Sequence, residues 1–186
     1  RSVEKIREAK ARGLRVTAAV SAHHLHLSEQ DIGEFDTRYH VMPPLRSIAD
    51  RDALRQGVIS GVIDAVCSDH QPHGIDAKLA PFSESASGIS GLETLLSLVL
   101  KLVEETTLSL PEAIARVTAH PARILGIDVG RLLPGAPADI CVFEPTNDWR
   151  VDPRKFISQG SNTPFDQSAL PGNVKMVLVA GQPLSA

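Results

Sequence analysis

The chain has 186 residues, of which 42% are hydrophobic and 22% are charged, and its formal net charge at pH 7 is -3. These proportions are typical of a globular protein and exclude a disordered one. The small negative charge gives no reason to expect nucleic acid or an anionic membrane as a partner, and no apolar run reaches the roughly 18 residues of a membrane span. A chain of this length forms one domain, or one and a half, with a real core.

Helical and strand patterns alternate over the first two thirds of the chain. Apolar side chains at helical spacing predict helices over residues 2–13, 47–61, 90–106 and 109–126. Short apolar, β-branched runs predict buried strands over residues 14–20 and 62–67. Ser47 is the expected cap of the second helix, and Ser-x-x-Glu capping boxes at Ser90 and Ser109 begin the last two. The third helix is apolar nearly all round, so it is expected to be covered.

This order predicts parallel strands joined by crossover helices. From Gly130 onward, short strand runs separated by Gly, Pro and Asn are typical of a small β domain. Two parallel strands cannot close an eight-stranded barrel, which takes about 250 residues, and the chain opens with Arg1, not Met, inside a helical pattern. We therefore expect an α/β chain with the C-terminal part of a TIM-like (β/α)8 barrel over residues 1–126 and a small β domain over residues 127–186. A small open sheet is the alternative.

The two cysteines, Cys67 and Cys141, both lie inside apolar runs. This placement predicts reduced cysteines in the core of a cytoplasmic protein. With only two cysteines, neither a disulfide framework nor a zinc ribbon is expected.

Candidate functional residues follow each predicted strand, where α/β folds place their sites. The first group is His23, His24 and His26, and the second is Asp69, His70 and His73. A carboxylate at a strand end is suited to bind a metal and to accept a proton from water. The alternative is that Asp69 caps a turn beside two solvated histidines. For the first group, we expect structural histidines that bond neighbouring loops.

Several stretches together resemble one family. They are "AHHLHL", "MPPLRSIADRDALRQGVISGVIDAVCSDHQPH", "GISGLETLL", "HPARILGI", "GRLLPGAPADICVFEP" and "SNTPFDQSALPGNVKMVLVAGQPL". Their order is similar to that of dihydroorotases in the cyclic amidohydrolase superfamily, over nearly the whole chain. The resemblance implies a zinc-dependent enzyme that interconverts dihydroorotate and N-carbamoyl aspartate in pyrimidine biosynthesis. It also implies a barrel with an appended small β domain, in which residues 14–20 and 62–67 are the last two barrel strands.

The resemblance also implies roles for single residues. Asp69 matches the strand-end aspartate that binds zinc and acts as general base toward the hydrolytic water. His73 matches a histidine that contacts the substrate carboxylate, and hydantoinases and allantoinases usually carry another residue there. Gly88 matches a glycine whose backbone N–H contacts the substrate. The family's remaining zinc ligands are expected upstream of Arg1, so the 186 residues alone are expected to be inactive.

Three positions depart from the family pattern. Met42 stands where active members usually have a substrate-binding Asn, Ala86-Ser87 stands where they have Pro-Phe, and Gln71 replaces an Ala. Losing an amide donor in a polar site typically costs about 1–3 kcal/mol. These departures favour the alternative, a non-catalytic dihydroorotase-like subunit that associates with aspartate carbamoyltransferase. Exposed apolar strand edges would in either case lead us to expect an oligomer.

Overall fold

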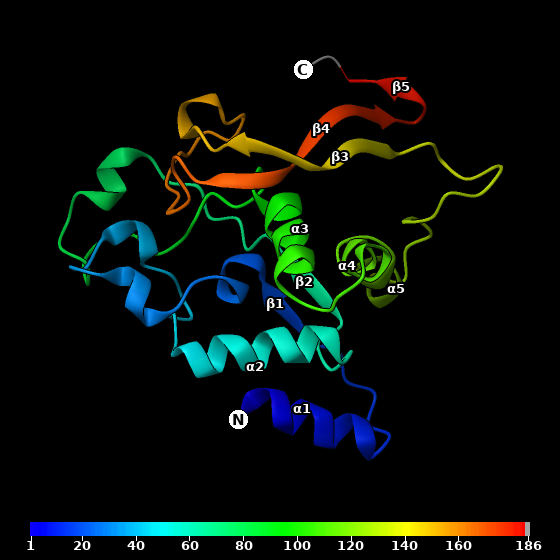
Figure 1. Ribbon diagram of the computed structural model, residues 1–186, viewed down its shortest axis with the longest axis horizontal. Helices are drawn as coiled ribbons and strands as arrows, with labels where there is room; N and C mark the ends of the chain where they lie inside the picture. Colours follow the sequence, from blue (N-terminus) through cyan, green and yellow to red (C-terminus); the bar gives the residue numbers. More distant parts are fainter. Residues whose placement is uncertain (185–186) are drawn as a thin grey trace.

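The computed structural model describes residues 1–184 and has α/β architecture (Figure 1). Its helices are α1 (Ser2–Ala11), α2 (Ile48–Ile59), α3 (Leu95–Glu105), α4 (Leu110–Ala115) and α5 (Ala119–Leu125). Its strands are β1 (Ala19–Ser21), β2 (Ala65–Cys67), β3 (Ile140–Arg150), β4 (Ala169–Val179) and β5 (Gln182–Pro183). In Figure 1, α1 and α2 lie at one end, and the β3–β4 hairpin crosses above α3 at the other. Residues 185–186, the end of the expected β domain, lie outside the described residues.

The two short strands β1 and β2 pair in parallel, as the helix-strand alternation predicts. Both are shorter than the runs at 14–20 and 62–67 from which they were predicted, because pairing begins only at Ala19 and Ala65. The chain before β1 lies at the surface, where Leu14 is 50% exposed. The strand pair therefore positions only the last residues of each run, next to the candidate site.

Helix α2 begins as expected, because the Ser47 hydroxyl accepts a hydrogen bond from the backbone N–H of Asp50. Helix α3 is covered, with Leu98, Leu100 and Leu102 buried. Its predicted capping box is wrong, however. The helix starts at Leu95, and Glu93 instead accepts a hydrogen bond from the distant backbone N–H of Ser158.

The helix predicted over residues 109–126 is two helices, α4 and α5. The capping box at Ser109 is confirmed, and Gly126 ends α5 in the left-handed conformation. Pro121 explains the break between the helices. A proline has no N–H and its ring clashes with the carbonyl four residues earlier, so it is tolerated in the first turn of α5 but not inside one continuous helix.

Strands β3, β4 and β5 form an antiparallel sheet in that order. Its inner end packs on α3, where the indole N–H of Trp149 donates to the Ser97 hydroxyl at 2.9 Å. The outer end is open, and Val142 and Val174 are 45% and 46% exposed. The expectation of core cysteines is therefore wrong: Cys141 lies on this open part, and Cys67 is the exposed last residue of β2.

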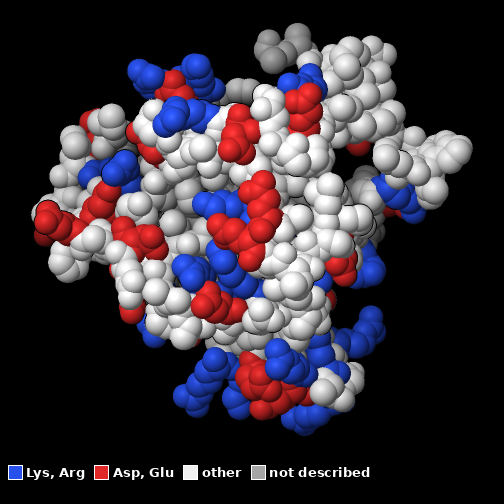
Figure 2. All heavy atoms as spheres, in the orientation of Figure 1, with Lys and Arg blue, Asp and Glu red and all other residues white. Residues whose placement is uncertain are grey.

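One main hydrophobic core joins the parallel pair, its helices and the inner end of the antiparallel sheet. Its most buried members include Val58, Val99, Leu102, Val151 and Leu170. Positive and negative side chains are interspersed over the face shown in Figure 2, including the lower end formed by α1. None of the helices within residues 1–184 combines the length and apolarity that a membrane crossing requires.

Candidate functional site

The register of β1 and β2 brings two sequence-distant groups together. Ser21 pairs with Cys67, so the residues two positions beyond each strand, His23 and Asp69, emerge at the same level. The His23 Nε2 and the Asp69 Oδ2 atoms are 4.0 Å apart. The carboxyl end of the parallel pair therefore presents an imidazole beside a carboxylate.

Asp69 is held by two polar side chains. The Ser21 hydroxyl donates to its Oδ2 at 3.0 Å, and the Gln71 amide donates to its Oδ1 at 3.2 Å. Its backbone has a φ of +46°, a left-handed conformation that is uncommon outside glycine. Such strain often accompanies functional positions, and the carboxylate of Asp69 contacts Ser21 at the end of β1. The side chain remains 28% exposed, so a ligand can reach it.

His23 is the residue for which the structure differs most from the sequence-based expectation. It was expected to bond a neighbouring loop, yet its buried Nε2 has no hydrogen-bond partner among the described residues. Burial lowers the pKa of His23 to about 4, with a further lowering by His24 and an opposing effect of Asp69. At neutral pH this imidazole is uncharged, so its ring nitrogens can include an acceptor or a metal donor.

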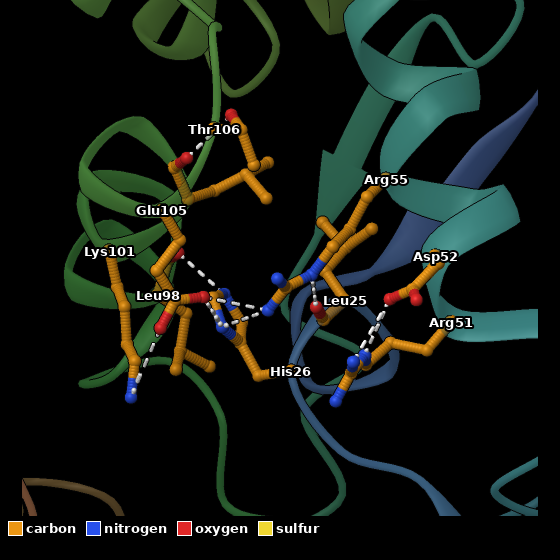
Figure 3. Close-up of polar contacts among 10 residues, drawn as sticks. Leu25, His26, Arg51, Asp52, Arg55, Leu98, Lys101, Glu105 and Thr106 are labelled. Atoms are coloured by element: carbon orange, nitrogen blue, oxygen red, sulfur yellow. Dashed lines mark hydrogen bonds and ion pairs between the residues drawn. The ribbon is translucent and has the colours of Figure 1, made fainter. Parts of the chain in front are cut away.

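The other two histidines of this stretch have the structural role that was predicted. His24 Nε2 lies 3.1 Å from the carbonyl of Pro43, and His26 Nε2 lies 2.8 Å from the carbonyl of Leu98. Figure 3 shows His26 between α3 and α2, with Arg55 reaching Glu105 beside it at 2.7 Å. His26 thus anchors the loop after β1 on α3, and the Arg55 guanidinium anchors it on α2 by donating to the carbonyl of Leu25.

His73 lies against the residues predicted to bind substrate with it. Its Nε2 is 2.9 Å from the carbonyl of Ser87. Gly88 follows with a φ of +133°, and a side chain there would collide with Gln71, whose carbonyl oxygen would lie 3.0 Å from the added Cβ. Glycine is therefore required by conformation and by space.

Two of the predicted substrate contacts look different in the structure. The backbone N–H of Gly88 donates to the carbonyl of His40 at 2.8 Å, so a substrate oxygen would have to replace that bond. Met42 is 62% exposed and belongs to neither hydrophobic cluster of the described chain. The structure thus brings His73, Ser87 and Gly88 together, and leaves Met42 at the surface.

His70, the third candidate after β2, turns away from Asp69. Its Nδ1 accepts hydrogen bonds from the backbone N–H groups of Gly91 and Leu92 at 3.1 and 3.3 Å. This side chain fixes the loop before α3, so its role is structural.

Asn162 is a site residue that sequence reasoning missed. It lies in the quoted stretch "SNTPF", but only the structure shows that its side chain contacts the backbone on both sides of the site, at His73 and Gly88. Its sequence separation from His73, 89 positions, hides this contact from local patterns.

Asp69 and His23 are candidates for the donor set that a zinc ion requires. Asp69 and the unpartnered His23 nitrogen are chemically suitable ligands, but zinc takes about four. Within residues 1–184, no three His, Cys, Asp or Glu side chains are grouped so that they could hold a metal ion. The described residues therefore do not form a metal site by themselves.

Known proteins that are similar to this chain in sequence and fold define its class. The sequence matches the amidohydrolase family over residues 3–184, and the chain belongs to that family. Within it, the chain is similar to dihydroorotases. A dihydroorotase of Syntrophus aciditrophicus is 46% identical over 97% of this chain and 42% of its own length. A dihydroorotase-like protein of Pseudomonas aeruginosa is 44% identical over 97% of this chain and 43% of its own.

The fold has solved counterparts in the same superfamily. The L-hydantoinase from Arthrobacter aurescens superposes with a TM-score of 0.91 at 28% identity, covering 98% of this chain and 42% of that one. The chain thus spans less than half the length of the proteins it matches. Sequence identity is higher to the dihydroorotases than to this hydantoinase.

Proposed function

We propose that this chain is the C-terminal part of a dihydroorotase-type enzyme. In this proposal, residues 1–126 complete a (β/α)8 barrel, β1 and β2 are its last two strands, and residues 127–186 belong to a small β domain. The parallel pairing of β1 with β2 supports the barrel assignment. The clustering of Asp69 with His23 and Ser21 at the carboxyl end of that pair supports a catalytic mouth there.

The proposed reaction is the reversible hydrolysis of dihydroorotate to N-carbamoyl aspartate. The oxygen of water bonds to the ring amide carbon, the C–N bond breaks, and the nitrogen takes a proton. Asp69 would accept the proton of the attacking water and return it to the leaving nitrogen. His73 would orient the substrate carboxylate, because its ring lies beside Ser87, next to Gly88, in the loop that follows Asp69.

The proposed cofactor is zinc, with Asp69 as one ligand. When bound, zinc would polarise the amide carbonyl and lower the pKa of the attacking water. His23 would be a second candidate ligand, because its Nε2 lies 4.0 Å from the Asp69 Oδ2. The remaining ligands would be supplied by a part of the protein outside this chain, which is why these residues alone are expected to be inactive.

The single observation that carries the proposal is the placement of Asp69 beside His23 at the ends of the parallel strands. His73, four residues after Asp69, contacts the carbonyl of Ser87 in the same region. The test is hydrolysis of dihydroorotate and of hydantoin by the full-length protein and by its H73A variant. We expect turnover of dihydroorotate with KM raised at least about tenfold in H73A. His120 bonds the carbonyl of Asp64 at the opposite end of β2, so H120A is the matched control. Hydantoin turnover that survives H73A would contradict the assignment.

A second candidate is a non-catalytic subunit that binds aspartate carbamoyltransferase. Two observations bear on its loss of catalysis and not on its partner: the Gln71 amide donates to Asp69 Oδ1, and the Gly88 N–H donates to the His40 carbonyl. If Gln71 blocks the site, the Q71A variant should gain zinc or activity that the wild type lacks. Wild-type turnover equal to that of Q71A would remove this reason for the second candidate.

A further inference from the structure

Asn162 joins three segments that are distant in sequence. Its side-chain oxygen accepts from the backbone N–H of His73 at 2.6 Å and lies 2.8 Å from the Ser90 hydroxyl. Its side-chain nitrogen donates to the carbonyls of Gly88 at 2.9 Å and Gln71 at 3.2 Å. The residue is only 7% exposed. One buried amide therefore ties the His73 loop to the Gly88 loop.

An asparagine side chain matches its three backbone partners. Its amide oxygen accepts from the His73 N–H, and its two N–H groups donate to the carbonyls of Gly88 and Gln71. The Ser90 hydroxyl has a single hydrogen, which it can give to the Asn162 oxygen or to the carbonyl of Gly160, each 2.8 Å away. The partners also determine the orientation, because the two carbonyls need a donor and the His73 N–H needs an acceptor. An aspartate would fit the volume but would place an oxygen against the carbonyls of Gln71 and Gly88.

The backbone around Asn162 is equally close to the site. The main-chain carbonyl of Asn162 accepts from Ser90 N–H at 2.8 Å. A side chain at Gly160 would collide with the backbone nitrogen of His73 and would lie 2.7 Å from the carbonyl carbon of Pro72. The segment 160–162 thus packs directly against the loop that carries His73.

We propose that Asn162 is a positioning residue for substrate binding. It sets the distance and orientation between His73 and Gly88, the two residues on either side of the substrate's expected place, without touching the substrate itself. The identity of the ligand rests on the proposed function, whereas the coupling between the two loops rests on the contacts above. Because Asp69 lies outside these bonds, the proposal predicts an effect on substrate binding and none on zinc content.

The test uses the full-length, zinc-loaded protein and its N162A and N162D variants, well below their melting temperatures. We expect KM for dihydroorotate to rise about tenfold or more in both variants, with kcat within about threefold of wild type and zinc content unchanged. Asn147 is exposed and bonds only Glu144 among its described contacts, so N147A is the control and should behave as wild type. A purely stabilising role would lower the melting temperature and leave KM within about twofold, which would overturn the proposal.

A second measurement does not depend on activity. The His73 amide should exchange with deuterium about tenfold faster in N162A, which removes its hydrogen-bond acceptor, while the amides of α3 exchange as in wild type. The G160A variant disturbs the same loop from the backbone side and should give the same local effect if either Asn162 variant fails to fold.

The two measurements separate the inference from the proposed function. If the wild type neither hydrolyses dihydroorotate nor binds it, the proposed function fails, and hydrogen exchange alone decides on Asn162. Faster exchange confined to the His73 loop then supports the coupling. Unchanged exchange at His73 in N162A and G160A overturns it.

Discussion

The ion pair between Glu105 and Arg55 gives a stability prediction that can be worked out from the structure. Glu105 ends α3, Arg55 lies on α2, and the two side chains meet at 2.7 Å beside His26 (Figure 3). The contact with His26, together with the charges of Arg55 and Lys101, lowers the pKa of the Glu105 carboxyl from 4.5 to about 2. Burial keeps His26 mostly neutral at pH 7, so Arg55 is the main cationic partner under those conditions.

The expected size of the effect follows from exposure. A fully buried carboxylate with this pKa would contribute about 3 kcal/mol, but the Glu105 side chain is 36% exposed, and solvent screening reduces the contribution to about 1 kcal/mol. The perturbation is E105Q, which removes the charge and keeps the shape. Because the folded pKa is lowered, the stabilisation is fully present above pH 4.5 and is lost as the pH falls toward 2.

Urea unfolding of the full-length protein measures this difference. We expect E105Q to lower the free energy of unfolding by about 1 kcal/mol at pH 7 and the gap to wild type to close as the pH falls from 4.5 toward 2. Glu104 is the exposed neighbour on α3, so E104Q is the matched control. An E105Q variant as stable as E104Q at pH 7, or a gap that persists at low pH, would refute the reasoning.

Two further predictions concern stability. Burial lowers the pKa of His26 below 6.5, so below pH 6.5 the unfolded chain takes up a proton more readily than the folded chain, and the free energy of unfolding of the wild type should fall as the pH falls. Urea unfolding at several pH values should show a weaker pH dependence of this free energy in H26Q, and an unchanged pH dependence would exclude His26 as its source. Leu102 is fully buried and Leu132 is 77% exposed, so L102A should cost about 3 kcal/mol and L132A less than about 0.5 kcal/mol; equal losses on urea unfolding would contradict the core assignment.

Much of the fold follows from local sequence signals. Helix α2 starts where Ser47 can cap it, and α4 starts at the capping box of Ser109. The failures come from contacts between distant segments. Ser90 and Glu93 match the sequence pattern of a capping box. In the structure, however, the Ser90 hydroxyl lies 2.8 Å from the side-chain oxygen of Asn162, and Glu93 accepts a hydrogen bond from the Ser158 N–H. A local motif is overridden when a tertiary partner offers the same side chains better bonds.

The candidate site also contains residues that local sequence indicates and residues that only contacts between distant segments reveal. Asp69 and His73 are candidates from the sequence alone, because both follow a strand run and match a family motif. His23 could not, because its significance depends on the register that sets it 4.0 Å from Asp69. Asn162 could not either, because its partners lie in segments that no spacing rule connects.

The zinc content and turnover of the full-length protein and its D69N variant test the central claim most directly. The account predicts that the wild type binds zinc and hydrolyses dihydroorotate, and that D69N, which can no longer accept a proton, loses at least about a hundredfold in kcat. D148N, at an exposed aspartate of β3, should retain wild-type activity. A wild type without zinc and without turnover when zinc is added, or a D69N variant as active as wild type, would contradict it.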